Sequence, residues 1–390
     1  MISIRLKQLR LARGLSLDEL VAKTAGIVTK QAISKYEQGK NTPSPRVLTK
    51  LAAALGVKAA HLASAPSVQV EFVAYRKKSD LSKKDQTKVE SLVTHCLEER
   101  IRLQDLIQDG SASNIPIQSL PVSNLDDAED AAETLRSRWN LGRDPIGSLT
   151  GVLENNRVHV LPIDANEKFD GISAVAYGEH KIIRGAAVVI QRDTPGERQR
   201  LNLAHELGHL VLKIQSEVDE EKAAFRFGGA FLAPRELMFH EVGQKRSVIG
   251  TEELLLLKQR FGLSIQALLH RLKDLSIIND HCYVQWWKYI SRRSWKKNEP
   301  NRLEPEKPEW LRQNVLRAFA EGVIGQEEAE SMLGEKIEVE PPLSLTTKKS
   351  FMKLPLDERW RLMAEQANKL QSHYEEDPEV RGLGGGDFVE

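Results

Sequence analysis

Five consecutive residues, His-Glu-Leu-Gly-His at 205–209, have the types and spacing of a metal-dependent hydrolase. On an α-helix, side chains four residues apart share a face, so His205 and His209 can ligate one Zn²⁺ ion. Glu206 follows His205 directly and can serve there as the general base of a hydrolysis. The alternative is a surface helix with incidental histidines. The apolar residues around the motif argue against it, because a buried carboxylate is costly unless it has a partner or a role.

A third ligand has to come from outside this motif. The longer pattern with a third histidine is absent, since Leu212 and Gln215 stand where its glycine and histidine would be. A carboxylate at the start of the next helix is therefore expected, and the spacing alone does not choose among the acids there. These acids are Glu217, Asp219, Glu220 and Glu221.

The carbonyl of a substrate would also need a polarising group. The candidates are Tyr177, His180 and Arg200, and the sequence does not distinguish them. His240 and His270 lack the spacing of metal ligands and are expected to be structural. No serine or cysteine nucleophile with matching partners stands out.

The residues around the motif predict a small sheet beside a buried helix. Thr194 and Pro195 supply a cap and a proline at the first turn, and the helix then runs over 197–213. Apolar, β-rich runs predict strands at 158–161, 172–177 and 186–190, with a weaker alternation at 69–75. Further helices are expected at 81–107, 126–139, 146–155, 252–262, 264–275, 310–321, 326–333 and 356–373.

The first 65 residues are predicted to form five short helices, and they are strongly basic. They hold eleven Lys and Arg residues against three acids, a formal charge of +8, whereas the rest of the chain carries −7 and the total is +1. Such asymmetry points to a polyanionic partner for the first segment. A solvated, positively charged module is the alternative that charge alone leaves open.

Two of these helices, joined by a short glycine-containing turn, have the pattern of a helix-turn-helix. Three motifs mark the segment: R-x-x-R-G-L-S at 10–16, I-S-K-Y-E-Q-G at 33–39 and L-x-K-L-A-A-A-L-G at 48–56. With these residues it closely resembles the Xre/Cro-repressor type of helix-turn-helix. The resemblance implies binding to double-stranded operator DNA, commonly as a homodimer. A protein-interaction domain with the same fold is the alternative.

The same resemblance indicates which residues would contact DNA. Lys30, Gln31 and Lys35 match positions that touch base edges in that family, and Ser34 lies close by. The chemistry suits this role, because lysine can reach guanine O6 and N7 and glutamine can pair with adenine N6 and N7. Thr29, at the start of the helix, can donate to a phosphate.

The body closely resembles the ImmA/IrrE metallopeptidase family in FDGISA (169–174), ERQRLNLAHELGHLVL (197–212) and EEKAAFRFGGAFLAP (220–234). The resemblance implies a zinc endopeptidase whose third ligand is Glu221, with Glu220 as the runner-up. Phe225 stands where the family usually has asparagine, a departure expected to weaken the support of the ligands. Members of the family cleave DNA-binding repressors, so the implied substrate is such a protein or this chain itself.

Together these features predict an α+β, mostly helical protein. An all-α helix-turn-helix domain is followed by a zincin-like metallopeptidase domain with a small sheet and a helical C-terminal part. The predicted divisions are a DNA-binding domain at 1–65, a connector with a long helix and a linker at 66–124, a peptidase domain at 125–290, and a linker with a helical region of unknown role at 291–390. Linkers are expected at 109–124 and 291–308, and a mobile tail at 381–390.

The composition favours a cytoplasmic protein. No stretch of eighteen uncharged apolar residues exists, so no membrane partner is expected, and the first residues lack the apolar core of a secretory signal. The two cysteines, Cys96 and Cys282, are too few for a disulfide framework, and Cys96 is expected to be a buried thiol. Two functions remain: a regulator with an active zinc endopeptidase domain, or a non-proteolytic Xre-family repressor or antitoxin that uses the peptidase fold as a sensor or docking domain.

Overall fold

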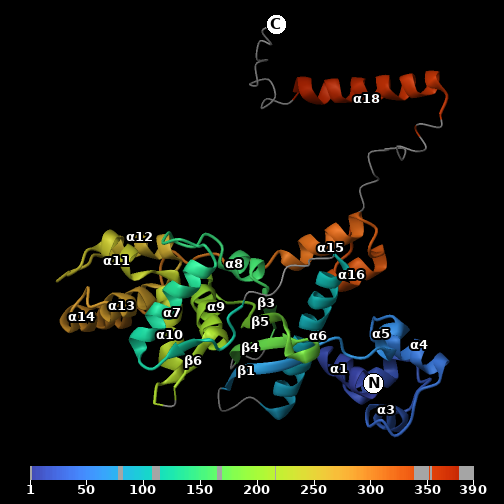
Figure 1. Ribbon diagram of the computed structural model, residues 1–390, viewed down its shortest axis with the longest axis horizontal. Helices are drawn as coiled ribbons and strands as arrows, with labels where there is room; N and C mark the ends of the chain where they lie inside the picture. Colours follow the sequence, from blue (N-terminus) through green and yellow to red (C-terminus); the bar gives the residue numbers. More distant parts are fainter. Residues whose placement is uncertain are drawn as a thin grey trace. The chain divides into compact units, whose positions relative to one another are not determined.

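The structure is a computed structural model that describes residues 2–77, 82–107, 115–164, 169–215, 217–337, 351 and 354–376. The chain forms two units, Met1–Gly334 and Glu335–Glu390 (Figure 1). The main described element of the second unit is helix α18 (Leu356–Glu376). The expected fold class, α+β and mostly helical with a small sheet, is confirmed.

Short helices form the N-terminal segment, because most of them begin at a capping residue and share one apolar core. Ser16 and Glu19 form the expected capping box of the second helix, and Ser44 caps the fourth, whose first residue is Pro45. The helices are α1 (Ile2–Ala12), α2 (Leu17–Lys23), α3 (Lys30–Glu37), α4 (Pro45–Ala54) and α5 (Ala59–Ala63). The core that holds them together includes the fully buried Leu6, Leu9, Leu20, Ile33, Leu51 and Leu55.

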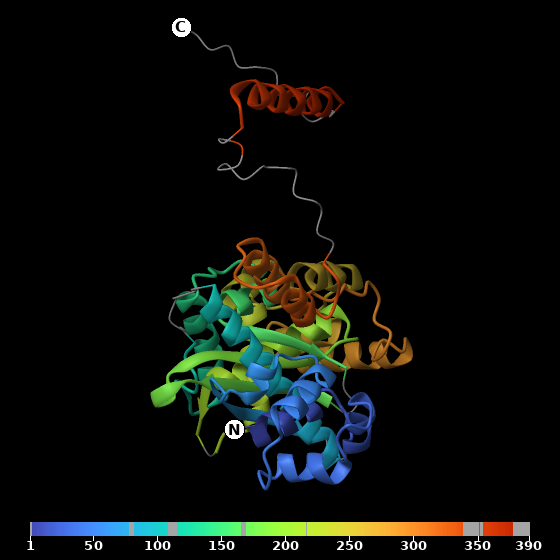
Figure 2. The same ribbon diagram turned by 90° about the vertical axis from the view of Figure 1, so that its right-hand side faces the viewer.

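A buried ion pair fastens this segment to the long helix α6 (Lys83–Leu106). The Arg5 guanidinium of α1 lies 2.5 Å from the Glu98 carboxylate of α6, and the two residues are 2% and 3% exposed. Figures 1 and 2 show the N-terminal helices packed beside α6. Arg10 is likewise paired with Glu37, at 2.6 Å. Part of the basic charge of the segment is therefore structural and does not face a polyanion.

A four-stranded sheet lies between α6 and helix α9 (Gly196–Val211). Its order is β1 (Gln69–Lys77), β4 (Phe169–Tyr177), β5 (Ile183–Gln191) and β3 (Val158–Ile163). β3 is parallel to β5, whereas β4 is antiparallel to both of its neighbours. Side chains alternate between the faces, so Ile172 and Ala174 pack towards α6 and Val175 packs in the core around α9. The expected strands are confirmed, each somewhat longer than its apolar run.

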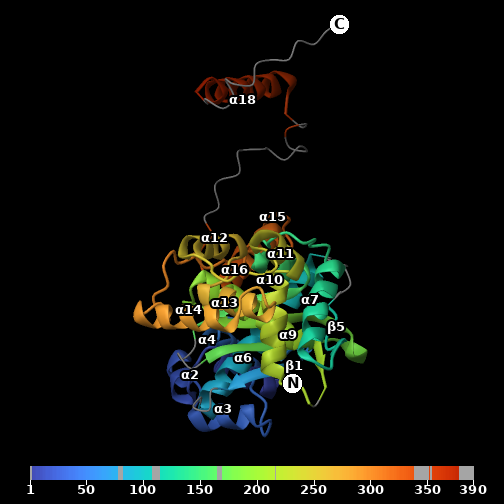
Figure 3. The same cartoon turned by 90° about the vertical axis from the view of Figure 1, so that its left-hand side faces the viewer.

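The remaining helices of the body pack on α9 directly, as α10 (Glu220–Leu232) and α8 (Leu149–Asn155) do, or on one another. Helix α10 packs between α9 and α7 (Leu125–Arg138), as Figure 3 shows. The helix expected from residue 146 begins later, at Leu149, because Ser148 caps it. The other elements are α11 (Arg235–Val242), α12 (Thr251–Phe261), α13 (Ile265–Asp274) and α14 (Asp280–Arg292).

The predicted linker over 109–124 is wrong where the structure describes it. Residues 108–114 lie outside the described residues, but Ile115 is buried and β2 (Leu120–Val122) pairs in parallel with β6 (Leu212–Ile214). Leu120 and Val122 are buried, and their polar neighbours in sequence concealed this strand. Because β6 begins where α9 ends, the pair ties the connector to the helix that carries the histidine motif.

The predicted linker over 291–308 is also wrong. Helix α14 includes its first residues, and residues 299–306, which we call the strap, lie across the start of α9. Gly196 N donates to Leu303 O at 2.9 Å, and a Cβ added to Gly196 would lie 2.3 Å from Glu304 O. Only glycine therefore allows the strap to lie this close to α9.

Carboxylates of the strap bind buried cations and the first turns of two helices. Glu306 pairs with the buried Arg200 and accepts a hydrogen bond from Thr150 N in α8 at 2.7 Å. Glu299 lies 2.8 Å from the buried ammonium group of Lys258 and accepts from Ile265 N, the start of α13, at 2.9 Å. The polar residues of this segment suggested a linker, but Glu299 and Glu306 bind partners that are far away in sequence.

The expected helical pair after the strap is present as α15 (Trp310–Ala320) and α16 (Gln326–Leu333). Cys96, expected to be a buried thiol, is only half-buried. The tail expected at 381–390 lies outside the described residues. Within the described parts of the chain, no helix combines the length and apolar character that a membrane crossing requires.

Removing the Glu306 carboxylate should destabilise the protein. In Glu306→Ala, Arg200, which is 6% exposed, loses its charged partner and α8 loses the acceptor at its first turn. Breaking a buried pair by removing one partner costs about 3–5 kcal/mol, and we expect a loss of this size in the free energy of unfolding measured in urea. Glu304→Ala is the control, because this neighbour is exposed. Equal stability of the two variants would mean that the strap is only a linker.

Candidate metal centre

Helix α9 carries the histidine motif and is buried on nearly all sides. Its leucines at 203, 207 and 210 pack in the main core. His205, Glu206 and His209 are 1%, 2% and 4% exposed. Because buried polar side chains need polar partners, the groups that these three face indicate what the helix can do.

Two imidazoles and one carboxylate converge at one point. The Nε2 atoms of His205 and His209 are 2.9 Å apart, and the oxygens of Glu221 lie 3.6 Å and 3.5 Å from them. One ligand atom from each residue lies within 4.8 Å of the other two. Two nitrogens on a tetrahedral zinc ion lie about 3.3 Å apart, so small side-chain shifts would give a coordination geometry. The structure thus brings together the three predicted ligands.

The neighbouring acid, Glu220, faces the other side of His209. Its carboxylate lies 3.1 Å from His209 Nδ1. A carboxylate that accepts the Nδ1 proton leaves the Nε2 lone pair for a metal and orients the ring. Asp219 instead caps α10 by accepting from Lys222 N, and this hydrogen bond lowers the pKa of Asp219. The geometry therefore favours Glu221 as the ligand and Glu220 as the group that orients His209.

Glycines let α10 approach α9 closely enough for this convergence. A Cβ on Gly228 would lie 3.1 Å from His205 N, and a Cβ on Gly208 would lie 3.2 Å from Ala224 Cα. Either methyl group would push the helices apart. Glu221 stands two turns before Gly228 on α10, so the separation of the helices sets the distance from its carboxylate to the imidazoles.

The carboxylate of Glu206 lies against strand β4. Ser173 Oγ donates to its Oε2 at 2.7 Å, and a Cβ on Gly171 would lie 2.5 Å from its Oε1. Ser173 therefore orients the carboxylate, and Gly171 leaves the room that it occupies. Sequence reasoning did not assign these two roles. The available signal was a glycine inside a strand pattern, which often marks a close approach.

Phe225 packs against the predicted ligand His205. The two ring centroids are 4.2 Å apart with planes tilted by 46°, and Phe225 is 43% exposed. The aromatic ring of Phe225 therefore contacts the imidazole of His205.

The three candidates for polarising a carbonyl do not meet Glu206. Arg200 pairs with Glu306 and donates to Ile146 O at 2.6 Å, so it has a structural role. Tyr177 lies six residues along β4 from the glycine that contacts Glu206, a distance of about 20 Å on a strand. His180 lies beyond it in the turn η1 (Glu179–Lys181).

The ligand atoms of His205, His209 and Glu221, and their access to solvent, fit a zinc ion. Two imidazole nitrogens and one carboxylate leave a fourth position open, as in hydrolytic zinc sites. The Glu221 side chain is 50% exposed, so the cluster borders solvent. A cavity of about 200 Å³ adjoins His209 and Glu220, smaller than a typical ligand pocket of roughly 300–1,000 Å³. Among the described residues, neither His240 nor His270 belongs to a cluster with metal-ligand spacing.

Helix α3 places the predicted DNA contacts on one face. Thr29 Oγ1 accepts from Ala32 N at 3.2 Å, so the hydroxyl caps the helix and its proton can still be donated. Lys30 forms a surface ion pair with Asp18 of α2 at 2.7 Å, and such pairs exchange easily for a phosphate. The predicted contacts are Thr29, Lys30, Gln31, Ser34 and Lys35, of which Ser34 is half-buried and the others are exposed.

Comparison with known families gives one match for the N-terminal helices and one for the segment that carries the histidine motif. Residues 6–62 match the helix-turn-helix family model, and residues 169–273 match a peptidase family model described as IrrE N-terminal-like domain. No curated protein and no solved structure matches the chain. The predicted resemblance, a helix-turn-helix segment fused to an ImmA/IrrE-like segment, is confirmed.

A methyl group on Gly228 should separate α9 from α10. By contrast, a Cβ on the neighbouring Gly229 would lie 3.6 Å from Cδ of Arg271, an ordinary van der Waals contact. Overpacking costs about 1–3 kcal/mol, so Gly228→Ala should lower the melting temperature and Gly229→Ala should not. Because the carboxylate would move from the imidazoles, zinc affinity should fall by roughly tenfold or more in Gly228→Ala alone. Equal zinc content of the two variants after equilibrium dialysis would contradict this role of helix packing.

Proposed function

We propose that the chain is a DNA-binding transcriptional regulator whose body is a zinc-dependent endopeptidase. The observation that carries the peptidase half is the convergence of His205, His209 and Glu221 ligand atoms within 4.8 Å, inside a segment that matches a peptidase family. The helix-turn-helix match and the exposed face of α3 support the DNA-binding half. The division into 1–65, 66–124, 125–290 and 291–390 stays a proposal, with the difference that β1, β2 and the strap pack on the body although they lie outside 125–290.

The residues of the centre would hold the metal in a defined orientation. His205, His209 and Glu221 would be its ligands, and Glu220 would keep the Nε2 atom of His209 directed at it. When bound, zinc would supply Lewis-acid chemistry, polarising the peptide carbonyl and making a water molecule more acidic.

Glu206 would move the proton. Its carboxylate takes the proton of the attacking water and later delivers it to the leaving amine. Ser173 holds this carboxylate in one orientation, and Gly171 leaves the space that it needs. The strand β4 therefore acts as the support of the general base, whereas α10 supports the metal.

The substrate class would be a DNA-binding repressor or this chain itself. The position of β1 favours the chain itself. Ala74 and Tyr75 of β1 pair with Ser173 and Ile172 of β4, the strand against which Glu206 lies. Strand addition of an extended peptide is a common mode of peptide recognition, and β1 joins the N-terminal helices to the body. Cleavage near β1 would break the covalent link between the N-terminal helices and the peptidase, so that only their packing on α6 would hold them together.

On DNA, α3 would lie in the major groove, and a homodimer would read a palindromic operator in the cytoplasm. The alternative function is a non-proteolytic Xre-family repressor or antitoxin in which the peptidase fold is a sensor or docking domain. Zinc binding separates the two. Zinc that the wild-type protein holds at the α9 cluster and that His205→Ala loses supports the peptidase. An α9 cluster that binds no zinc, in protein that still binds its operator, supports the alternative.

Replacing Glu206 by glutamine should stop cleavage without removing the metal. The amide cannot take up the proton, so the rate should fall by about 10²- to 10⁴-fold. Zinc content should equal that of the wild type, because Glu206 is not among the three ligands. Cleavage in cells is measured by mass spectrometry of the new protein N-termini that appear when either the wild type or Glu206→Gln is produced. Self-cleavage is tested in vitro by adding wild-type protein, as the enzyme, to full-length Glu206→Gln protein, as the substrate. Cleavage at the wild-type rate would refute the mechanism.

Substitutions on α3 should weaken and broaden operator binding. Loss of one base contact costs about 1–3 kcal/mol, or about 5- to 150-fold in affinity, and we expect this for Gln31→Ala and Lys35→Ala. Lys7→Ala is the control, because Lys7 is exposed on α1. Selection from a random double-stranded library defines the operator, and binding curves at one salt concentration then compare the variants. If all three bind alike, α3 does not read the bases.

A further inference from the structure

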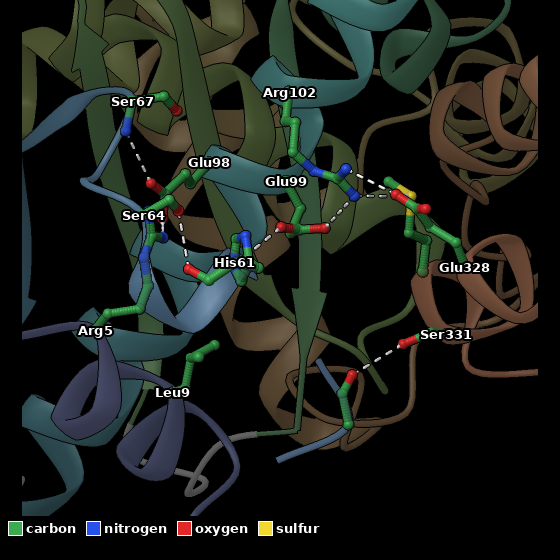
Figure 4. A network of polar contacts seen from close by, with 12 residues as sticks. Arg5, Leu9, His61, Ser64, Ser67, Glu98, Glu99, Arg102, Glu328 and Ser331 are labelled. Atoms are coloured by element: carbon green, nitrogen blue, oxygen red, sulfur yellow. Dashed lines mark hydrogen bonds and ion pairs between the residues drawn. The ribbon is translucent and has the colours of Figure 1, made fainter. Parts of the chain in front are cut away.

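A second cavity lies where the N-terminal helices meet α6 and α16. Its volume is about 470 Å³, and its walls include Arg13, His61, His95, Glu99 and Glu328. Figure 4 shows His61 facing Glu99, and Glu99 in turn reaching Arg102. Neither the peptidase proposal nor the DNA-binding proposal uses these residues.

Three possible metal ligands meet in this cavity. His61 comes from α5, and His95 and Glu99 lie four residues apart on one face of α6. His61 Nε2 is 3.6 Å from Glu99 Oε1, too long for a hydrogen bond. One ligand atom from each residue lies within 4.8 Å of the other two. Apart from the cluster of α9 and α10, this is the one such group among the described residues.

Two imidazole nitrogens in this group are buried without a hydrogen-bond partner in the described part of the structure. They are His61 Nε2 and His95 Nδ1. Burial lowers the pKa of His95 to about 4 and also lowers that of His61, so both rings are neutral near pH 7. Neutral imidazole is the form that binds a metal, and an unsatisfied buried nitrogen costs free energy that a ligand would recover.

The cavity as a whole is lined by four cations (Arg13, Lys58, Arg100 and Arg102) and three carboxylates (Glu99, Glu327 and Glu328), so the argument for a metal comes from the cluster of ligand atoms and not from the overall charge. Arg5 is bound to Glu98 outside the group, and Arg102 is bound to both Glu99 and Glu328. Arg13 also lines the cavity, and Glu99 is the main carboxylate that offsets its charge. A divalent cation between His61, His95 and Glu99 would meet a carboxylate and two neutral imidazoles, which can each turn a nitrogen lone pair to it.

We propose that His61, His95 and Glu99 form a second binding site for a divalent transition metal of the zinc class, between the DNA-reading helices and α6. The ion joins α5 to α6 next to the Arg5–Glu98 pair, so it strengthens the attachment of the N-terminal helices to the body. Helix α6 also packs on the sheet that supports Glu206. Metal bound at His61, His95 and Glu99 would therefore make the attachment of the N-terminal helices to the body depend on the metal concentration.

The test counts metal ions in a protein from which the first centre has been removed. Full-length His205→Ala/His209→Ala protein, dialysed against zinc, should retain one zinc ion per chain by elemental analysis. Addition of His61→Ala or Glu99→Gln should reduce this to none, whereas His281→Ala, an exposed histidine on α14, should leave it at one. This count does not depend on whether the α9 cluster binds metal, because both of its histidines are absent. If the α9 cluster binds no zinc, the wild-type protein will hold the same number of zinc ions as the His205→Ala/His209→Ala protein, which would count against the peptidase proposal alone.

A second measurement guards against loss of folding. In the presence of a chelator, the variants should melt within a few degrees of the parent, and zinc should raise the melting temperature of the parent alone. Cobalt in place of zinc should give absorption bands of nitrogen and oxygen ligation that Glu99→Gln weakens. A parent that binds no zinc, or folded His61→Ala and Glu99→Gln variants that still bind it, would overturn the proposal.

Discussion

The close approach of α9 and α10 is the constraint on which the rest of this molecule depends. It exists because Gly208 and Gly228 carry no side chains at the contact, and it places Glu220 and Glu221 beside His209. Three further elements hold α9 in position: β6 extends its end into a strand pair with β2, the strap crosses its start, and β4 meets Glu206 from the sheet. A metal centre needs its ligands within a few tenths of an ångström, and a helix fixed at both ends meets that need.

Buried charge connects the parts of the first unit. Arg5 with Glu98, Arg200 with Glu306 and Lys258 with Glu299 each join elements distant in sequence. Such pairs contribute little net stability, because desolvation offsets much of their attraction. They act instead as constraints on geometry, since a cation buried at the wrong position would have no partner. The same logic explains how the N-terminal helices and the strap each have one defined place on the body.

Much of the fold could be predicted because its signals are local. The capping residues, the apolar runs of β3, β4 and β5, and the spacing of His205 and His209 all act within a few residues. For the same reason the composition predicts linkers at 109–124 and 291–308, although residues 115–124 and 299–306 pack on the body. Their order comes from β6, Arg200 and Lys258, and nothing in their own composition reveals these partners.

By itself the sequence determined that two imidazoles and a carboxylate share one buried helix, because helical periodicity follows from spacing alone. It also determined the helix-turn-helix pattern and which face of its second helix is polar. Only the tertiary structure placed Glu221 beside both Nε2 atoms and Glu220 beside His209 Nδ1, paired Arg200 with Glu306, and brought His61 beside His95 and Glu99. Each of these outcomes depends on the packing of separate elements. A difference of one residue turns a side chain by about 100° around a helix, so which acid meets the imidazoles is settled only when the two helices touch.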